Sequence, residues 1–128
     1  MSSNSDLDDS VRTSISRLHG DPETRVQTLT ERAPTDERLT DQTEVFSALA
    51  HPDRIRILSI LRDGECCVCE LQAALDSPQS TVASHLRTLR DAGMVNTRKD
   101  GKWTHYRIAD TATLQLLDIA AALGGDGE

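Results

Sequence analysis

The sequence has few aromatic residues and almost no lysine. Its 128 residues include one Trp, one Tyr and one Phe, so Leu, Ile, Val and Ala must form most of the core. No apolar run approaches the roughly 18 residues of a membrane span, and the first residues lack the basic and apolar regions of a secretory signal. These absences favour a soluble cytoplasmic protein without membrane association, built as one domain and a tail.

The charges are unevenly distributed along the chain. The formal net charge is −7, and only two of the fourteen basic residues are lysines, Lys99 and Lys102. An acidic surface that keeps arginine but little lysine resembles proteins from salt-accumulating halophiles. Residues 77–108 hold six basic and two acidic residues, a net charge of +4, whereas the rest of the chain carries −11. A basic segment within an acidic chain predicts contact with phosphate groups.

Residues 77–93 have the pattern of an amphipathic helix. Ser77 suits the N-cap, with proline after it, and a glycine closes the segment. Val82, Leu86 and Leu89 fall at i, i+4 and i+7 and so form one apolar stripe. The opposite face is polar and basic, which suits the major groove of DNA, where base edges need donors and acceptors. We predict a DNA-recognition helix, and the alternative is an ordinary amphipathic surface helix.

Helical patterns also precede this segment. They cover residues 40–50, 53–61 and 70–75, and a tight turn at 76–78 joins the last of them to the recognition helix. Two helices joined by such a turn form a helix-turn-helix. Residues 1–38 are polar and offer too little apolar surface to offset the entropy of ordering, so we predict a disordered tail with at most a transient helix.

The pattern changes from helix to strand after the recognition helix. Residues 94–98 and 103–108 are rich in β-forming side chains, and an Asp-Gly pair lies between them, which is a strong hairpin signal. Lys99 and Lys102 lie near its tip. Such a basic hairpin is expected to act as a wing that contacts the minor groove or phosphates.

Residues 111–123 are predicted to form a last helix, which Asp110 or Thr111 caps. It is too apolar for one exposed face, so pairing with a second copy of the chain is the preferred interpretation, and packing wholly on its own domain is the alternative. The sequence thus predicts a mainly α fold with a small β-hairpin, a dimeric winged helix-turn-helix over residues 39–123 and a C-terminal tail at 124–128.

The candidate binding residues follow from these elements. His85 lies at the edge of the apolar stripe, so packing against the interior is its alternative role. The candidate DNA contacts are Gln79, Ser80, Thr81, Ser84, His85, Arg87, Thr88, Lys99 and Lys102. The candidate dimerisation residues are Leu114, Leu117, Ile119 and Leu123.

All three cysteines lie close together, at Cys66, Cys67 and Cys69, near the start of the third helix. In a cytosolic protein such a cluster indicates metal or redox chemistry rather than a structural disulfide. A helix N-terminus is expected to lower a thiol pKa, which favours the thiolate that binds soft ions. Three thiolates suit As(III) or Sb(III), whereas a structural zinc site has four ligands. No organic cofactor is expected.

Four segments resemble, in the same order, those of the ArsR/SmtB family of metal-responsive repressors. They are residues 46–58, 65–71, 79–93 and 101–107, within a resemblance that covers about residues 43–110. The resemblance implies a winged-helix homodimer that binds operator DNA and represses its own operon until an inducer binds.

The cysteine segment departs from the arsenic-sensing pattern of that family. Cys67-Val68-Cys69 matches it, but the third cysteine of the pattern corresponds to Gln72, and Cys66 takes the place of an apolar residue. In a regular helix Cys66 and Cys69 share a face while Cys67 points elsewhere. The third ligand is therefore open, and binding by two thiolates is an alternative.

Other functions fit the sequence less well. A thiol-redox repressor on the same fold would use the same cysteines. A cysteine-dependent enzyme is disfavoured, because no glycine-rich loop or Cys/His/acid triad is apparent, and we predict that the chain is not an enzyme. A protein-interaction module without DNA binding would tolerate replacement of Arg87 or Lys102.

Overall fold

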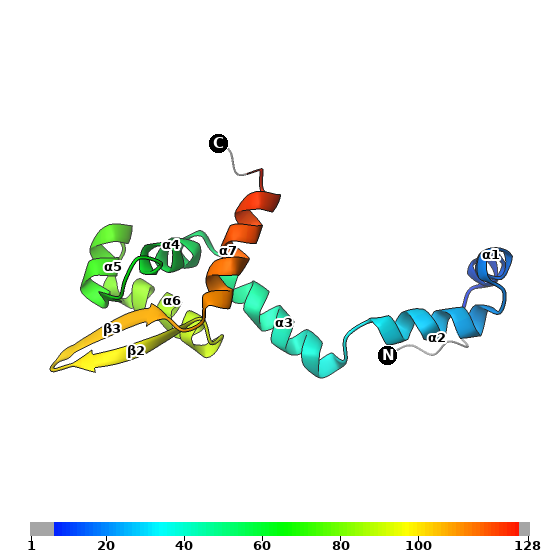
Figure 1. Cartoon of the computed structure of the whole chain (residues 1–128), viewed down its shortest axis with the longest axis horizontal. Helices are drawn as coiled ribbons and strands as arrows, with labels where there is room; N and C mark the ends of the chain where they lie inside the picture. The colour runs from blue at the N-terminus through cyan, green and yellow to red at the C-terminus, as the bar shows by residue number, and fades with distance from the viewer. Residues whose placement is uncertain (1–6, 126–128) are drawn as a thin grey trace. The chain divides into compact units, whose positions relative to one another are not determined.

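The computed structural model describes residues 7–125 of the chain (Figure 1). The chain forms two compact units, each with its own internal contacts, and the boundary lies between Asp41 and Gln42. No helix within residues 7–125 combines the length and the apolar character that a membrane span needs.

The N-terminal unit is helical. Helix α1 spans Asp9–His19, helix α2 spans Pro22–Arg32, and helix α3, Asp36–Leu49, begins in this unit and continues into the next. Residues 1–6 of the predicted tail lie outside the described residues, and these helices differ from the disorder predicted for residues 7–38. They form because their signals are local: the Asp8 side chain accepts a hydrogen bond from the Ser10 N–H at the start of α1, while α1 and α2 contain no buried residue.

The second unit contains the predicted helix-turn-helix. Helix α4 spans Pro52–Leu61, α5 spans Val68–Leu75, α6 spans Gln79–Asp91 and α7 spans Thr111–Leu123. All lie where the sequence predicts helices, with one- or two-residue shifts at their starts.

The start of the recognition helix α6 differs in one detail from the prediction. Pro78, rather than Ser77, occupies the N-cap position. The Ser77 hydroxyl instead donates to the Leu75 carbonyl, at 3.3 Å, and so belongs to the turn. The helix ends as predicted, with Gly93 at a φ of 78°, a conformation that glycine adopts without steric cost.

Three antiparallel strands form the wing. Strands β2, Val95–Asp100, and β3, Trp103–Ile108, make the predicted hairpin, and a third strand β1, Cys66–Cys67, pairs with the other edge of β3. In this register Cys66 lies opposite Tyr106 and Cys67 lies opposite His105. The sequence did not predict β1, because two residues have no detectable alternation.

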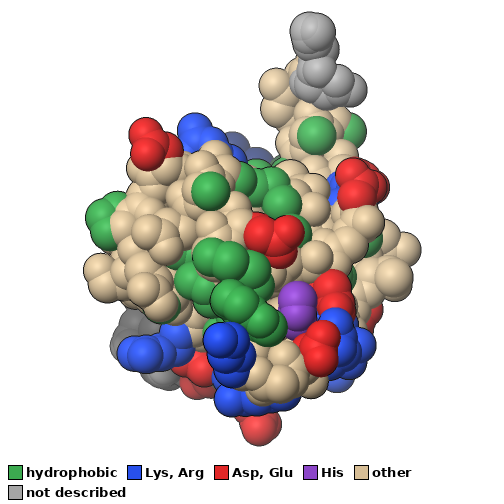
Figure 2. All heavy atoms as spheres, turned by 90° about the vertical axis from the view of Figure 1, so that its left-hand side faces the viewer, with side chains coloured by type: hydrophobic (Ala, Val, Ile, Leu, Met, Phe, Trp, Pro, Cys, Tyr) green, Lys and Arg blue, Asp and Glu red, His purple; other side chains and the backbone are tan. Residues whose placement is uncertain are grey.

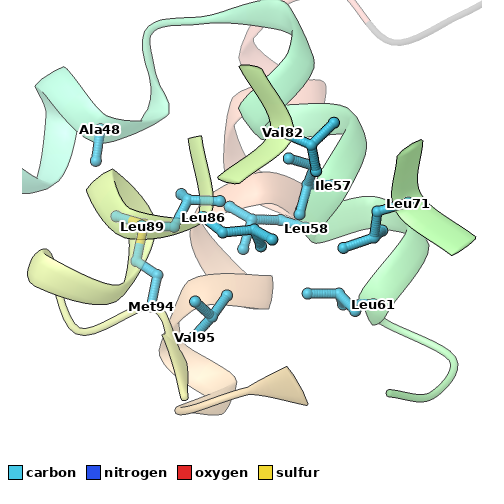
Figure 3. Packing of buried hydrophobic residues seen from close by; sticks show 10 residues of the cluster. All are labelled: Ala48, Ile57, Leu58, Leu61, Leu71, Val82, Leu86, Leu89, Met94 and Val95. Carbon is cyan, nitrogen blue, oxygen red and sulfur yellow. The ribbon is translucent and has the colours of Figure 1, made fainter. Parts of the chain in front are cut away.

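One hydrophobic core holds the helices and strands of the second unit together (Figure 3). Val82, Leu86 and Leu89 are fully buried, which confirms the predicted apolar stripe of α6. The whole cluster consists of Ala48, Ile57, Leu58, Leu61, Leu71, Val82, Leu86, Leu89, Met94 and Val95. Because these side chains come from α3, α4, α5, α6 and the root of the wing, the core fixes the recognition helix relative to the wing.

Candidate nucleic-acid interface and thiol site

The outward face of α6 carries most of the predicted DNA-contact residues. Gln79, Ser80, Ser84 and Arg87 are exposed, while Thr81 and Thr88 are half-buried. Ser80, Ser84 and Arg87 lie opposite the buried stripe, and Gln79 is exposed at the first position of the helix, so these polar groups face solvent without disturbing the core. These groups donate and accept hydrogen bonds, which is the chemistry that base edges in a major groove require.

His85 is an exception, because it is buried and the prediction that it contacts DNA is wrong. It is buried and faces the start of α4, where its ring centroid lies 4.4 Å from that of His51 and its Nδ1 lies 3.4 Å from Arg54 Nη1. Burial, with smaller contributions from His51 and Arg54, lowers the pKa of His85. A buried imidazole turned toward α4 cannot reach a base edge, so the alternative inward role is the one found.

The wing presents its lysines at the tip. Lys99 and Lys102 are exposed, neither forms an ion pair within residues 7–125, and Lys102 Nζ lies 5.7 Å from the centre of the Trp103 ring. Arg98, by contrast, is paired with an acidic residue. Its Nε donates to Glu65 Oε1 at 3.0 Å, and this hydrogen bond lowers the pKa of Glu65. The two lysines are therefore exposed wing cations that can contact phosphates.

The three cysteines lie on two elements. Cys66 and Cys67 form β1 and are half-buried, whereas Cys69 lies in the first turn of α5 and is exposed. Cys67 is also the N-cap of α5, and its N–H donates to Glu70 Oε1 at 2.9 Å. All three are free thiols.

This arrangement brings Cys67 and Cys69 together. A hydrogen bond with the Cys67 side chain is the main reason that the pKa of Cys69 is raised. The expectation from a regular helix, that Cys66 and Cys69 share a face, is wrong here because the helix begins only after Cys67. The extended conformation of Cys67, with φ −83° and ψ 167°, turns its side chain toward the helix instead.

The electrostatic environment also differs from the expected one. Burial raises the pKa of the Cys66 thiol, and the nearby Glu70 carboxylate adds to this. The sequence predicts lowered thiol pKa values from the helix N-terminus, but Glu70 places a negative charge in the same turn, and the thiols interact with one another. Protonated thiols therefore dominate at neutral pH for Cys66 and Cys69.

The cysteines do not form a ready three-ligand cluster. Within residues 7–125, the one group of three or more potential ligand atoms that all lie within 4.8 Å of one another consists of His51, Asp53 and His85. At least one of the three sulfur–sulfur distances therefore exceeds this limit, so an ion bound by all three would have to draw β1 and α5 together.

The pair of thiols adjoins both parts of the predicted DNA interface. Cys67 and Cys69 line a hollow together with Gln79, the first residue of α6, and with Lys102 and Trp103 of the wing. The face that includes α5 and the hairpin tip carries apolar side chains beside Lys and Arg (Figure 2). A ligand held in this hollow would thus lie beside both the recognition helix and the wing.

The last helix leaves apolar side chains in solvent. Ile119 and Leu123 are 56% and 85% exposed, whereas Leu114 and Leu117 are half-buried and Leu117 packs against the core. Phe46 and Ile55 join α7 in lining an apolar hollow. The sequence missed these last two residues as candidate interface positions, because the helices that carry them also have core-facing positions.

Comparison with known proteins identifies the family. The sequence profile described as "Bacterial regulatory protein, arsR family" matches residues 51–97. An uncharacterized HTH-type transcriptional regulator of Methanocaldococcus jannaschii is 35% identical over 88 residues, which are 68% of this chain and 99% of that protein. The chain belongs to the ArsR family. The ArsR/SmtB resemblance and the winged helix-turn-helix fold are thereby confirmed.

Two further relatives are named as repressors, one of them of an arsenical resistance operon. The arsenical resistance operon repressor of Escherichia coli is 43% identical over 67 residues, or 52% of this chain and 57% of that protein. The transcriptional repressor SmtB of Mycobacterium tuberculosis is 40% identical over 94 residues, covering 73% of this chain and 70% of that one. The chain thus spans only part of these two relatives. These ArsR-family relatives are regulators rather than enzymes.

Two solved structures have the same fold. HlyU from Vibrio cholerae matches with a TM-score of 0.62 at 30% identity, covering 70% of this chain and 97% of that one. The homodimeric winged helix-turn-helix DNA-binding domain Mb0332 from Mycobacterium bovis matches with a TM-score of 0.66 at 27% identity, covering 73% and 90%.

Proposed function

We propose that this ArsR-family regulator is a homodimeric repressor of operator DNA that As(III) or Sb(III) releases by binding at the cysteines. The observation that carries the proposal is the hollow shared by Cys67, Cys69, Gln79 and Lys102. The inducer site would then adjoin the first residue of the recognition helix and the tip of the wing.

The proposed DNA contacts are those on the exposed face of α6 and at the wing tip. Arg87, Lys99 and Lys102 supply positive charge for phosphates, and Gln79, Ser80, Thr81, Ser84 and Thr88 supply donors and acceptors for base edges. His85 is not included, because it faces the interior.

The proposed homodimer would cover the apolar residues of α7. Ile119 and Leu123 from α7 and Phe46 from α3 are large exposed side chains, and covering them with the same surface of a second copy would remove them from water. Two recognition helices would then read two half-sites of one operator.

Inducer binding can weaken DNA binding only if the ion prefers the DNA-free conformation. Drawing Cys67 and Cys69 around an ion would move β1, and with it β3 of the wing, because these strands are paired. An ion in the shared hollow would also lie beside Gln79 at the start of α6. A coupling of about 1–3 kcal/mol would weaken DNA binding about 5- to 150-fold.

The test is fluorescence anisotropy of labelled DNA from the region upstream of the gene, in high KCl, titrated with arsenite. We expect arsenite to release the DNA from the unaltered protein but not from Cys67→Ser or Cys69→Ser. Tight DNA binding that arsenite leaves unchanged would refute metalloid sensing.

Two further variants identify the third ligand. Cys66→Ser abolishes the response if Cys66 binds the ion, and leaves it intact if two thiolates suffice. Gln72→Cys restores the cysteine of the arsenic-sensing pattern, and we expect it to lower the arsenite concentration needed for release if Cys66 is not a ligand.

A thiol-redox repressor is the second candidate, and the contact between Cys67 and Cys69 favours it. One of the similar solved structures is described as reduced HlyU from Vibrio cholerae. The raised pKa values of Cys66 and Cys69 disfavour oxidation and ion binding alike, because both reactions use the thiolate, so they do not separate the two candidates. Counting free thiols after mild oxidant, in parallel with DNA release, separates oxidation from arsenite binding.

We also propose that the protein works in a salt-rich cytoplasm. Its acidic composition with two lysines supports this. Because counterion release contributes less as salt rises, operator binding would depend more on base contacts and shape. Specific binding that persists at high KCl, where a non-specific sequence no longer binds, is the expected result.

A further inference from the structure

We propose that His51, Asp53 and His85 form a second ion site, which binds one divalent transition ion of the zinc class. His51 and Asp53 lie at the start of α4, and His85 lies in the middle of the recognition helix α6. The site therefore lies on different elements from the cysteines.

The three side chains already converge. Their potential ligand atoms all lie within 4.8 Å of one another, and His85 Nε2 lies 3.9 Å from Asp53 Oδ2. In a tetrahedral site with bonds of about 2.1 Å the ligand atoms are about 3.4 Å apart, so these two atoms must approach by roughly half an ångström. Side-chain rotation supplies a movement of that size without rearrangement of the helices.

The orientation of Asp53 supports the proposal. Its Oδ1 accepts a hydrogen bond from Arg56 Nη1 at 2.6 Å, which leaves Oδ2 directed at His85. A carboxylate whose second oxygen is held by a neighbouring donor is a typical ligand arrangement, because the outer contact fixes the direction of the inner one.

The donor types select the class of ion. Two imidazoles and one carboxylate suit zinc and similar first-row ions, whereas calcium and magnesium prefer oxygen ligands alone. Imidazole binds a metal in its neutral form, through the lone pair of one ring nitrogen.

Two existing contacts must yield when the ion binds. His51 Nδ1 accepts a hydrogen bond from the Asp53 N–H at 3.1 Å and so caps α4. Arg54 Nη1 lies 3.4 Å from His85 Nδ1, and this contact is lost when Nδ1 carries the proton that Nε2 gives up. Arg54 keeps its other hydrogen bond, from Nε to the Ala48 carbonyl at 2.8 Å. Ion binding would therefore tie α6 to α4 and loosen it from Arg54.

The test uses the full-length chain with Cys66, Cys67 and Cys69 all changed to Ser, so that the thiols cannot contribute. Co²⁺ is the probe, because its visible absorption reports tetrahedral nitrogen and oxygen ligands. We expect one Co²⁺ per protomer, displaced by Zn²⁺, with a rise in the melting temperature.

Ligand variants in the same background identify the site. His51→Asn keeps a side-chain acceptor for the α4 cap but removes the imidazole, and Asp53→Asn weakens the carboxylate. Each is expected to weaken Co²⁺ binding about 100-fold, since loss of an outer-shell partner alone costs about 10- to 100-fold. His105→Gln, on the wing, is the matched control and should bind Co²⁺ normally.

The outcomes separate clearly. Loss of binding in His51→Asn, with His105→Gln unaffected, supports the site. A triple-serine protein that binds no Co²⁺, or that binds it equally well after His51→Asn, overturns it. His51 is only half-buried, so His51→Asn is expected to fold. It therefore tests the site even if a variant of the buried His85 does not fold.

Discussion

Leu86 and Arg87 are neighbours in the recognition helix, and we predict that replacing them affects two separate properties. Leu86 is fully buried in the core, whereas Arg87 is exposed on the opposite face. Leu86→Ala should therefore reduce the stability of the fold, and Arg87→Ala should reduce the affinity for DNA.

The expected magnitudes follow from burial and charge. Truncating a buried leucine loses its transfer free energy and leaves a cavity, which together cost about 2–5 kcal/mol. That is a large part of the roughly 5–15 kcal/mol by which a domain is stable. An exposed substitution changes stability by less than about 0.5 kcal/mol. Losing one phosphate contact per protomer should lower the salt slope of DNA binding by about 2 for a dimer.

The stability assay is equilibrium unfolding in urea at one protomer concentration, because dimerisation makes the apparent stability depend on concentration. The DNA assay is anisotropy of operator DNA at several KCl concentrations. The reasoning is refuted if Arg87→Ala lowers the free energy of unfolding as much as Leu86→Ala does, or if Arg87→Ala leaves the salt slope unchanged.

Three further predictions concern other parts of the chain. Asp110 accepts a hydrogen bond from the Ala112 N–H at 2.8 Å and caps α7, so Asp110→Ala should cost about 1 kcal/mol in urea unfolding, and an unchanged midpoint would contradict this. The raised pKa of Cys69 predicts that, at pH 8, iodoacetamide modifies this metal-free thiol more slowly than a cysteine in a short peptide, as site-resolved mass spectrometry can show. Cys67→Ala removes the hydrogen bond that is the main cause of the raised pKa, and it should speed the modification of Cys69 by iodoacetamide. Ile119→Asp should weaken the proposed dimer at least about tenfold in sedimentation equilibrium, and a dimer of unchanged strength would exclude Ile119 from the interface.

The helices and the wing could be predicted because their signals are local. The apolar stripe at Val82, Leu86 and Leu89 and the Asp-Gly turn are periodic or positional patterns within single elements. The N-terminal helices show the limit of this reasoning. Composition predicts disorder there, whereas α1 and α2 are helical without a buried residue, α1 with Asp8 as its cap and α2 with Pro22 in its first turn.

The thiol site could be predicted only in part. The sequence brings the three cysteines within a few positions, but it cannot show that Cys66 and Cys67 extend as a strand while Cys69 lies in a helix. That division depends on pairing with β3, some forty residues away in the chain, and a pairing partner at that separation leaves no mark on the local pattern.

The sequence by itself determined the family, the order of α4 to α7 with the hairpin between α6 and α7, and which face of α6 is buried, since each depends on patterns within one segment. Only the tertiary structure decided which side chains meet across segments: Cys67 with the start of α6, Phe46 with α7, and His85 with His51. The reason is geometric. His85 lies at the edge of the apolar stripe, where either direction is compatible with the helical pattern, and the position of α4 settles that it points inward.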